Sequence, residues 1–152
     1  MNLCTCKTTS SSAVIYAAGL KYLGTKEIPG RKTNALIAGW IKESADWLDR
    51  DDSKTAWCGC FRGHLGMVTA TGAPRAHYRA RNWLDWGRPI DHENPAAWQQ
   101  GDTVIMSRSG GHHVCLFSAL TSKTSAQFLG GNQDDKVSIA EYPLSRVIGV
   151  RR

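Results

Sequence analysis

The sequence predicts an α+β protein in which N-terminal helices pack on a C-terminal antiparallel β-sheet. Before Gly87, apolar residues recur at helical spacing, whereas the residues after it form short runs rich in β-branched and aromatic side chains. Gly, Asn, Asp and Pro separate these runs, as is typical of turns between strands. Because the helices come first and the strands second, the chain favours helices against an antiparallel sheet.

The first predicted helix is capped within the serine run Ser10 to Ser12 and ends at Gly24. Its inward face would hold Val14, Ala17, Ala18 and either Leu20 or Tyr22. A loop that contains the turn Pro29-Gly30 connects it to the next helix.

The second predicted helix follows Asn34, a good N-cap, and covers 35–44. Its inward face would hold Leu36, Ile37, Trp40 and Ile41. The acidic stretch 45–55 reads as a loop. A third helix is expected from Trp57 to about Thr71, and a short helical piece over 77–87. The runs expected to be strands are DTVIMS, HHVCLFSAL, AQFLG, KVSIAEY and RVIGVRR.

The bulk properties fit one soluble domain over 1–152, with 1–9, which include Cys4 and Cys6, as a frayed terminus. No run approaches the roughly 18 apolar residues of a membrane span, and the N-terminus makes a poor signal peptide. We therefore expect synthesis in a cytoplasm and no stable membrane insertion. The net charge of +6 favours polyanions. However, the basic residues are scattered and no binding motif accompanies them, so nucleic acid is not expected as a partner.

The stretch AWCGC places Cys58 at the start of the third predicted helix and Cys60 two residues later. Unsatisfied N–H groups and the positive end of the helix dipole favour a thiolate at such a position. Two residues along a helix, Cys60 points to a different side. The pattern thus predicts a reactive sulfur at Cys58 and a packing role for Cys60.

A thiolate nucleophile needs a base, and the base needs a group that orients it. The run SGGHHVCLFSAL offers two histidines on opposite faces of a strand, so only one of His112 and His113 can face Cys58. The next strand ends in FLGGNQDD, where Asn132 follows two glycines that permit close backbone approach. A Cys at a helix start, a His on one strand and a polar side chain on the next form a papain-type arrangement.

Several blocks of the sequence, in order from about Leu23 to the end, resemble CHAP-type cysteine peptidoglycan hydrolases and their NlpC-type relatives, and more closely the small single-domain branch in phage lysis cassettes. The matching blocks are LGTKEIPG, DDSKTAWCGCF, ARNWLDWG, QGDTVIM, SGGHHVCLF and GGNQDDKVSIAEY. The resemblance implies a papain-like fold and a catalytic set of Cys58 as nucleophile, His113 as general base and Asn132 as orienting residue. Two positions depart from the pattern, since thiols stand at Cys60 and Cys115 where other small residues are usual.

The implied activity is that of an endolysin-like hydrolase that cleaves a peptidoglycan amide, either between muramic acid and L-alanine or within the stem peptide or cross-bridge. Such a protein would wait as a monomer in the host bacterial cytoplasm until a holin-type pore releases it to the wall. A secreted antibacterial effector amidase and a wall-binding module without catalysis are the alternatives. No cofactor is expected. Calcium at the acidic loop Asp46–Asp52 is an alternative to a solvated loop, and the cysteines and histidines lack the spacing typical of zinc sites.

Glu27 is expected to hold a loop by hydrogen bonds. Trp57, Trp83 and Trp86 are either core residues or part of the lining of a substrate groove, and the sequence favours the core.

Overall fold

The computed structural model describes residues 10–30 and 32–152; Cys4 and Cys6 lie outside these residues. It has three helices, α1 (Ser11–Leu20), α2 (Ala35–Ser44) and α3 (Cys58–Val68), followed by a sheet. The strands are β1 (Pro89–Ile90), β2 (Thr103–Arg108), β3 (Gly111–Leu120), β4 (Ser125–Gln133), β5 (Lys136–Pro143) and β6 (Val147–Arg151). Short 3-10 turns occupy Ala80–Asp85, Pro95–Ala97 and Leu144–Arg146. The predicted α+β class is therefore confirmed.

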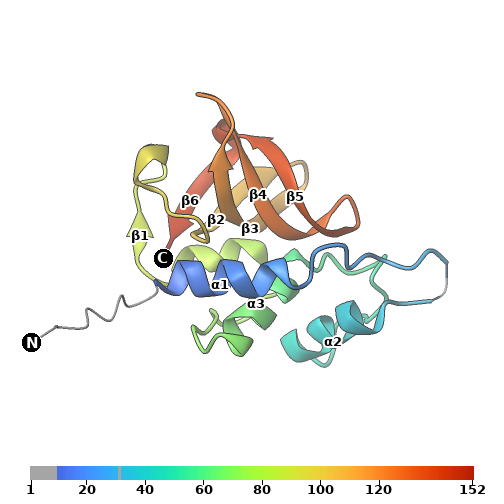
Figure 1. Ribbon diagram of the computed structural model, residues 1–152. Coiled ribbons are helices and arrows are strands. Elements are labelled where there is room, and N and C mark those ends of the chain that lie inside the picture. Colours follow the sequence, from blue (N-terminus) through green and yellow to red (C-terminus); the bar gives the residue numbers. More distant parts are fainter. Residues whose placement is uncertain (1–9, 31) are drawn as a thin grey trace, which may run out of the picture.

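The six strands form one antiparallel sheet in the order β1-β6-β2-β3-β4-β5. Figure 1 shows the sheet curling above the three helices, with α1 and α3 directly beneath it. The C-terminal strand β6 lies between β1 and β2, one strand in from the edge of the sheet. Within the described residues, no helix is long and apolar enough to cross a membrane.

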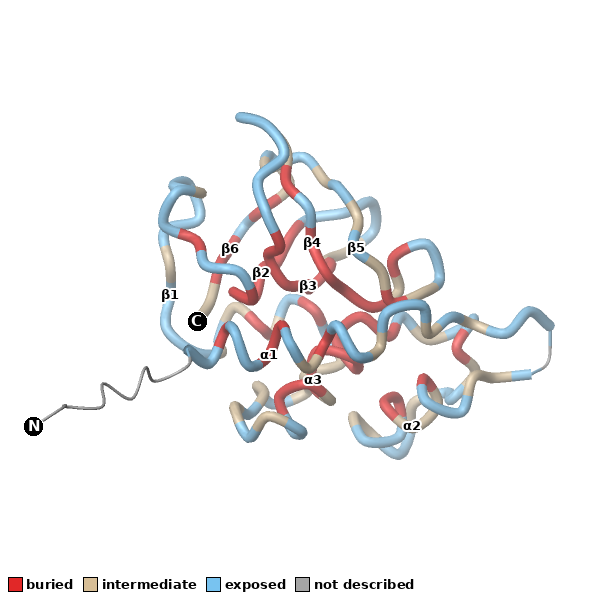
Figure 2. The backbone as a smooth tube through the Cα atoms, viewed as in Figure 1, coloured by how far each residue is buried: buried red, intermediate tan, exposed pale blue. Residues whose placement is uncertain are grey.

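Two main groups of buried side chains lie on opposite faces of the sheet. Figure 2 shows the buried residues concentrated along the central strands and on parts of the helices. The first joins the helices to β3 and β4, and includes Trp40, Phe61, Leu65, Leu116 and Leu129. The second fills the curl of the sheet, and includes Val104, Met106, Phe117, Phe128 and Val150. Alternation along β3 explains the division, because Leu116 and Phe117 point to opposite faces.

A buried carboxylate fixes the N-terminal helix to the sheet. Asp102, fully buried, accepts hydrogen bonds from the Ser12 hydroxyl at 2.8 Å and from the Gln99 backbone N–H at 2.8 Å, and pairs with Arg152 at 2.6 Å. Multiple donors satisfy both carboxylate oxygens, as a buried charge requires. Asp102, the residue before β2, thus has a structural role.

The predicted caps are confirmed: Ser10 accepts from the Ala13 N–H, and Asn34 accepts from the first turn of α2. The predicted inward face of α1 is confirmed at Ala18, which packs against the core, and is wrong at Val14 and Ala17. Ile15 and Tyr16 are buried, whereas Val14 and Ala17 are exposed. Since α1 is apolar on nearly every side, its periodicity does not fix its rotation. Leu36 of α2 is also exposed, contrary to expectation.

Candidate active site

Cys58 is the first residue of α3, as predicted, and its side chain is only 4% exposed. Trp57 precedes the helix without providing a side-chain cap, so the first-turn N–H groups receive no acceptor from it. Gly59 allows this turn to lie against the loop at His77 and Tyr78, because a Cβ there would come within 2.5 Å of the His77 carbonyl oxygen. The helix start is therefore held close to neighbouring backbone.

The Cys58 thiol interacts with the ring of His113, the second residue of the pair in the HHV motif. Burial alone would raise the pKa of this thiol. Three interactions outweigh the effect of burial: a hydrogen bond and charge interaction with His113, a hydrogen bond from the Val114 N–H, and the positive charge of Arg108. The net result is a pKa below the ordinary 9.0. A lowered pKa favours the thiolate, which is the nucleophilic form of cysteine.

His113 is 7% exposed and lies at the start of β3. Burial would lower the pKa of its ring, but hydrogen bonds and charge interactions with Cys115 and Cys58 raise it well above the ordinary 6.5. A thiol pKa that falls and an imidazole pKa that rises both favour transfer of the thiol proton to the imidazole. Strand alternation alone allowed either His112 or His113 to face Cys58. In the structure, His113 is the histidine that interacts with the Cys58 thiol.

The carboxamide that contacts His113 belongs to Gln133. Its Oε1 lies 3.0 Å from His113 Nε2. The amide nitrogen of Gln133 donates to the backbone oxygens of Phe128 at 3.1 Å and Ser138 at 2.8 Å, so the amide cannot flip without losing both bonds. Because Oε1 can only accept, Nε2 must carry a proton. Nδ1 is then the ring nitrogen available to exchange a proton with a sulfur.

Asn132, predicted to orient His113, makes no hydrogen bond to it. The register of β4 against β5 shifts between Gly130 and Gln133, and Asn132 adopts a left-handed backbone conformation with φ of 56°. This bulge changes the alternation, because an extra residue in one strand redirects the side chains next to it. Asn132 turns toward the surface cavities, and Gln133 takes the place next to the ring.

The two glycines before Asn132 make this arrangement possible. A Cβ on Gly130 would lie 2.5 Å from Gln133 Oε1, and one on Gly131 would lie 2.7 Å from the Trp57 ring and 2.8 Å from Phe61. Gly130 thus leaves space for the amide that contacts His113, while Gly131 lets β4 approach α3. The predicted role of these glycines, close backbone approach, is confirmed.

The other thiols near the site are inert by comparison. Burial raises the pKa of Cys60 to about 11 and also raises the pKa of Cys115. Cys60 packs in the core among the helices, as predicted, and Cys115 lies in the core inside the curl of the sheet. Among the described cysteines, only Cys58 has a lowered pKa.

Glu27 has the loop-holding role expected of it. Its Oε1 accepts a hydrogen bond from Trp57 Nε1 at 2.9 Å, which ties the first loop to the residue before the nucleophile. Trp57 and Trp83 are fully buried, so they are core residues. Trp86 is partly buried and stacks under the guanidinium of Arg62.

The acidic loop does not gather its carboxylates in one place. Asp49 and Asp51 both lie near Lys54, and Asp52 is buried, where it accepts the Asn34 N–H at 3.0 Å. In residues 10–30 and 32–152, no group of three or more Cys, His, Asp or Glu side chains is arranged to hold a metal ion. His64 makes hydrogen bonds with Tyr22 and Glu43, and thus has a structural role.

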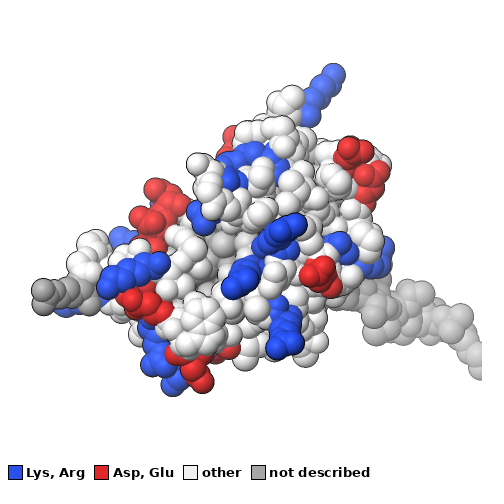
Figure 3. Space-filling model, turned by 180° about the vertical axis from the view of Figure 1, so that it is seen from behind, with Lys and Arg blue, Asp and Glu red and all other residues white. Residues whose placement is uncertain are grey.

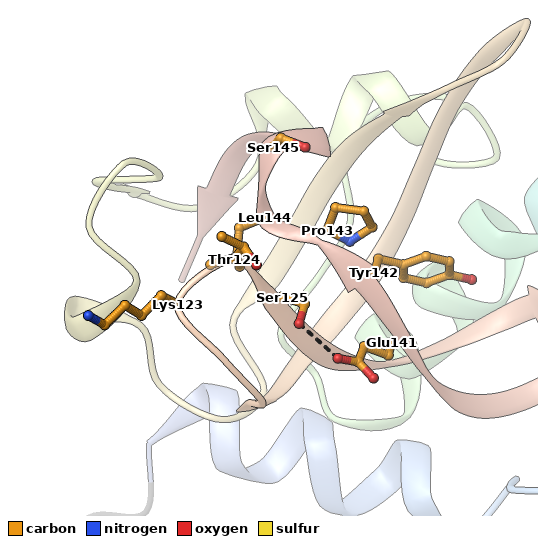
Figure 4. A pocket seen from close by; sticks show the side chains of 8 residues that line it. All are labelled: Lys123, Thr124, Ser125, Glu141, Tyr142, Pro143, Leu144 and Ser145. Atoms are coloured by element: carbon orange, nitrogen blue, oxygen red, sulfur yellow. Dashed lines mark hydrogen bonds between the residues drawn. The ribbon is translucent and has the colours of Figure 1, made fainter.

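Several cavities open on the surface around the site. One of 140 Å³ lies beside His113 and one of 530 Å³ lies beside Ala56 and Glu27, and both are lined by Arg108 and Asn132. A further cavity, of 670 Å³, lies at the far end of β4 and β5, where Ser125 donates to Glu141 at 2.8 Å (Figure 4). Neither Cys nor His lines that cavity. Basic side chains are spread over the face in Figure 3 with acidic ones among them, as the sequence predicts.

Comparison with known proteins gives no family for this chain. No family model matches the sequence, and no curated protein matches it.

Proposed function

We propose that this chain is a cysteine amidase with a papain-like fold that hydrolyses an amide bond of bacterial peptidoglycan. The observation that carries the proposal is the buried chain Cys58–His113–Gln133, in which the thiol pKa is lowered, the imidazole pKa is raised and an amide fixed by two carbonyls holds the ring. Perturbed pKa values beside a surface cavity are typical of catalytic groups.

The chemistry of this arrangement is acyl transfer in two steps. The Cys58 thiolate attacks the carbonyl carbon of the substrate amide. The carbonyl oxygen then becomes an oxyanion next to the Cys58 N–H at the start of α3. The tetrahedral species collapses as His113 Nδ1–H protonates the departing nitrogen, which leaves a thioester and a free amine. Water then attacks the thioester while Nδ1 accepts its proton, and the carboxylic acid and the thiolate are released.

The substrate class rests on two further arguments. The blocks around Cys58, His113 and Gln133 resemble cell-wall hydrolases of the CHAP and NlpC type. In addition, a net charge of +6 suits an anionic cell wall, because a basic protein concentrates on a polyanionic surface. The candidate bonds are the amide between muramic acid and L-alanine, and the peptide bonds of the stem or the cross-bridge.

Clearing of permeabilised bacterial cells tests the proposal directly. The wild type should lower the turbidity of the suspension, whereas Cys58→Ala should leave it unchanged, since loss of a catalytic nucleophile costs about 10⁴-fold or more in rate. Mass spectrometry of the digested wall should then show new amine and carboxyl termini that identify the bond. Circular dichroism of Cys58→Ala provides the control for folding.

Two results would contradict the proposal. Equal clearing by the wild type and Cys58→Ala would remove the thiol from the mechanism. Tight binding of purified walls by both proteins, without any new termini, would indicate a wall-binding module that lacks catalysis.

A further inference from the structure

The 140 Å³ cavity beside the catalytic ring has a basic lining. A water molecule takes about 30 Å³ of liquid volume, so this space holds a carboxylate and the carbons attached to it. The cavity is lined by Met106, Arg108, His113, Asn132, Gln133, Asp134, Tyr142 and Arg146. Its two guanidinium groups come from the end of β2 and from the 3-10 turn before β6.

Each arginine is held by a hydrogen bond from its own Nε, and the two terminal nitrogens of each guanidinium make no hydrogen bond within the described residues. Arg108 Nε donates to the His112 carbonyl at 3.0 Å, and Arg146 Nε donates to the Ser107 carbonyl at 3.2 Å. Within the described residues, neither guanidinium forms an ion pair. Anchored guanidinium forks are suited to carboxylates, because their remaining N–H groups can donate two parallel bonds.

One carboxylate of the protein lies in the same lining, and it does not neutralise the pair. The Asp134 side chain is 92% exposed and lies 3.6 Å from Lys136. Tyr142 fills the wall between the arginines and the imidazole, with its ring 5.9 Å from that of His113 and 5.4 Å from the Arg146 guanidinium. Tyr142 also lines the large open cavity of Figure 4, so the basic cavity continues onto the surface.

The second cavity that Arg108 lines is less basic. Its lining includes three carboxylates, from Glu27, Asp52 and Asp135, together with the cations Lys54 and Arg108. It also includes Thr55 and Ala56, which shortly precede the nucleophile. Carboxylates therefore outnumber cations in this cavity, whereas guanidinium groups outnumber the single carboxylate in the cavity beside His113.

The mechanism decides which half of the substrate meets the basic cavity. His113 delivers its proton to the departing nitrogen, so the amine half of the substrate must lie on the His113 side. From this geometry we infer that Arg146 and Arg108 bind a free carboxylate on the amine half of the substrate, near the cleaved bond. The inference rests on the proposed function and adds the chemical class of group that the site selects.

Chemical amidation of one batch of purified peptidoglycan tests the inference. Treatment with a carbodiimide and excess ammonia converts free carboxylates to carboxamides, and lysozyme digestion of both forms serves as the control for access. The wild type should cleave untreated walls about 10-fold to 100-fold faster than amidated walls, in keeping with 1.5–3 kcal/mol for a hydrogen bond to a charged group. Arg146→Gln should cleave both forms at the slow rate of the amidated walls.

Matched variants separate this role from a structural one. Arg146→Lys keeps the charge and should retain part of the preference, whereas Arg88→Gln, an exposed arginine on another segment, should retain all of it. Arg146 is the better test than Arg108, because Arg108 also lowers the pKa of Cys58.

Three outcomes are distinguishable. Equal cleavage of both walls by the wild type, or an equal loss on both walls in Arg146→Gln, would overturn the inference and leave the proposed function intact. No cleavage of untreated walls by the wild type would overturn the proposed function, and the inference with it. A preference that Arg146→Gln removes and Arg88→Gln keeps would support both.

Discussion

Cys58 and Cys60 are two residues apart on one helix, are both nearly inaccessible to solvent, and have opposite chemistry. The pKa of Cys58 is lowered, whereas the pKa of Cys60 rises to about 11. At about 100° per residue, the two side chains point about 200° apart around α3. Cys58 thus faces His113 and β3, while Cys60 faces the apolar core between the helices.

The comparison teaches that burial by itself makes a cysteine less reactive. Desolvation acts on both thiols in the same direction, since it disfavours the charged form. Only the imidazole, a backbone N–H and a nearby guanidinium reverse the effect at Cys58. The activity of the site should therefore depend on the partners of the sulfur more than on the position of the sulfur in the sequence.

The largest expected effect comes from removing the partner of Cys58. His113→Ala should lower the rate of wall cleavage by about 10³-fold or more, because the variant lacks both the base and the charge that stabilises the thiolate. His112→Ala should stay within about threefold of the wild type, as expected for a surface substitution. Initial rates of wall solubilisation measure both. A reversed result would show that the other histidine serves the thiol.

Alkylation by iodoacetamide compares the two thiols directly. The thiolate fraction of Cys58 at pH 7 should exceed that of Cys60 by at least about 100-fold, since the pKa of Cys58 lies below 9.0 and that of Cys60 is about 11. The rate at Cys58 should rise with pH through a midpoint below 9.0. In His113→Ala that midpoint should move above 9.0, because burial is then opposed by weaker interactions. Peptide mapping by mass spectrometry assigns each modified thiol, and equal rates at the two cysteines would refute the comparison.

Substitution of the two neighbouring carboxamides sharpens the assignment of the orienting residue. Gln133→Ala should reduce kcat by about 10-fold to 100-fold, comparable to the loss of other groups that orient a functional histidine. Asn132→Ala should have a smaller effect and act mainly on KM, since Asn132 lines the cavities and does not contact the ring. The midpoint of Cys58 alkylation should shift in Gln133→Ala alone. A larger loss of kcat in Asn132→Ala would restore the role that the sequence assigned to it.

The smallest effect on activity is expected at Cys60. Cys60→Ala should lower the free energy of unfolding by about 1–2 kcal/mol through a small cavity in the core between the helices. Its kcat should remain near that of the wild type. Urea unfolding and wall cleavage measured on the same sample check the two expectations, and a loss of kcat without a loss of stability would assign Cys60 to the chemistry.

The elements with a clear periodic or capping signal were predictable from sequence. Asn34 marks the start of α2, and the β-branched runs mark β2 to β6. The two-residue strand β1 was missed, because a strand this short has no pattern of its own and depends on pairing with β6. The rotation of α1 was predicted wrongly, because a helix that is apolar on all sides is oriented only by its contacts, here with Leu65, Leu116 and Leu129 around Gly19.

By itself, the sequence determined that a thiol stands at a helix start and that a histidine and a carboxamide lie on later strands. These features depend on local rules of capping and alternation, which act over a few residues. Only the tertiary structure decided which carboxamide reaches the ring. The register shift in β4 arises from pairing with β5 and from the close approach of α3 at Gly131. Because of the one extra residue in β4, Gln133 and not Asn132 lies next to the His113 ring.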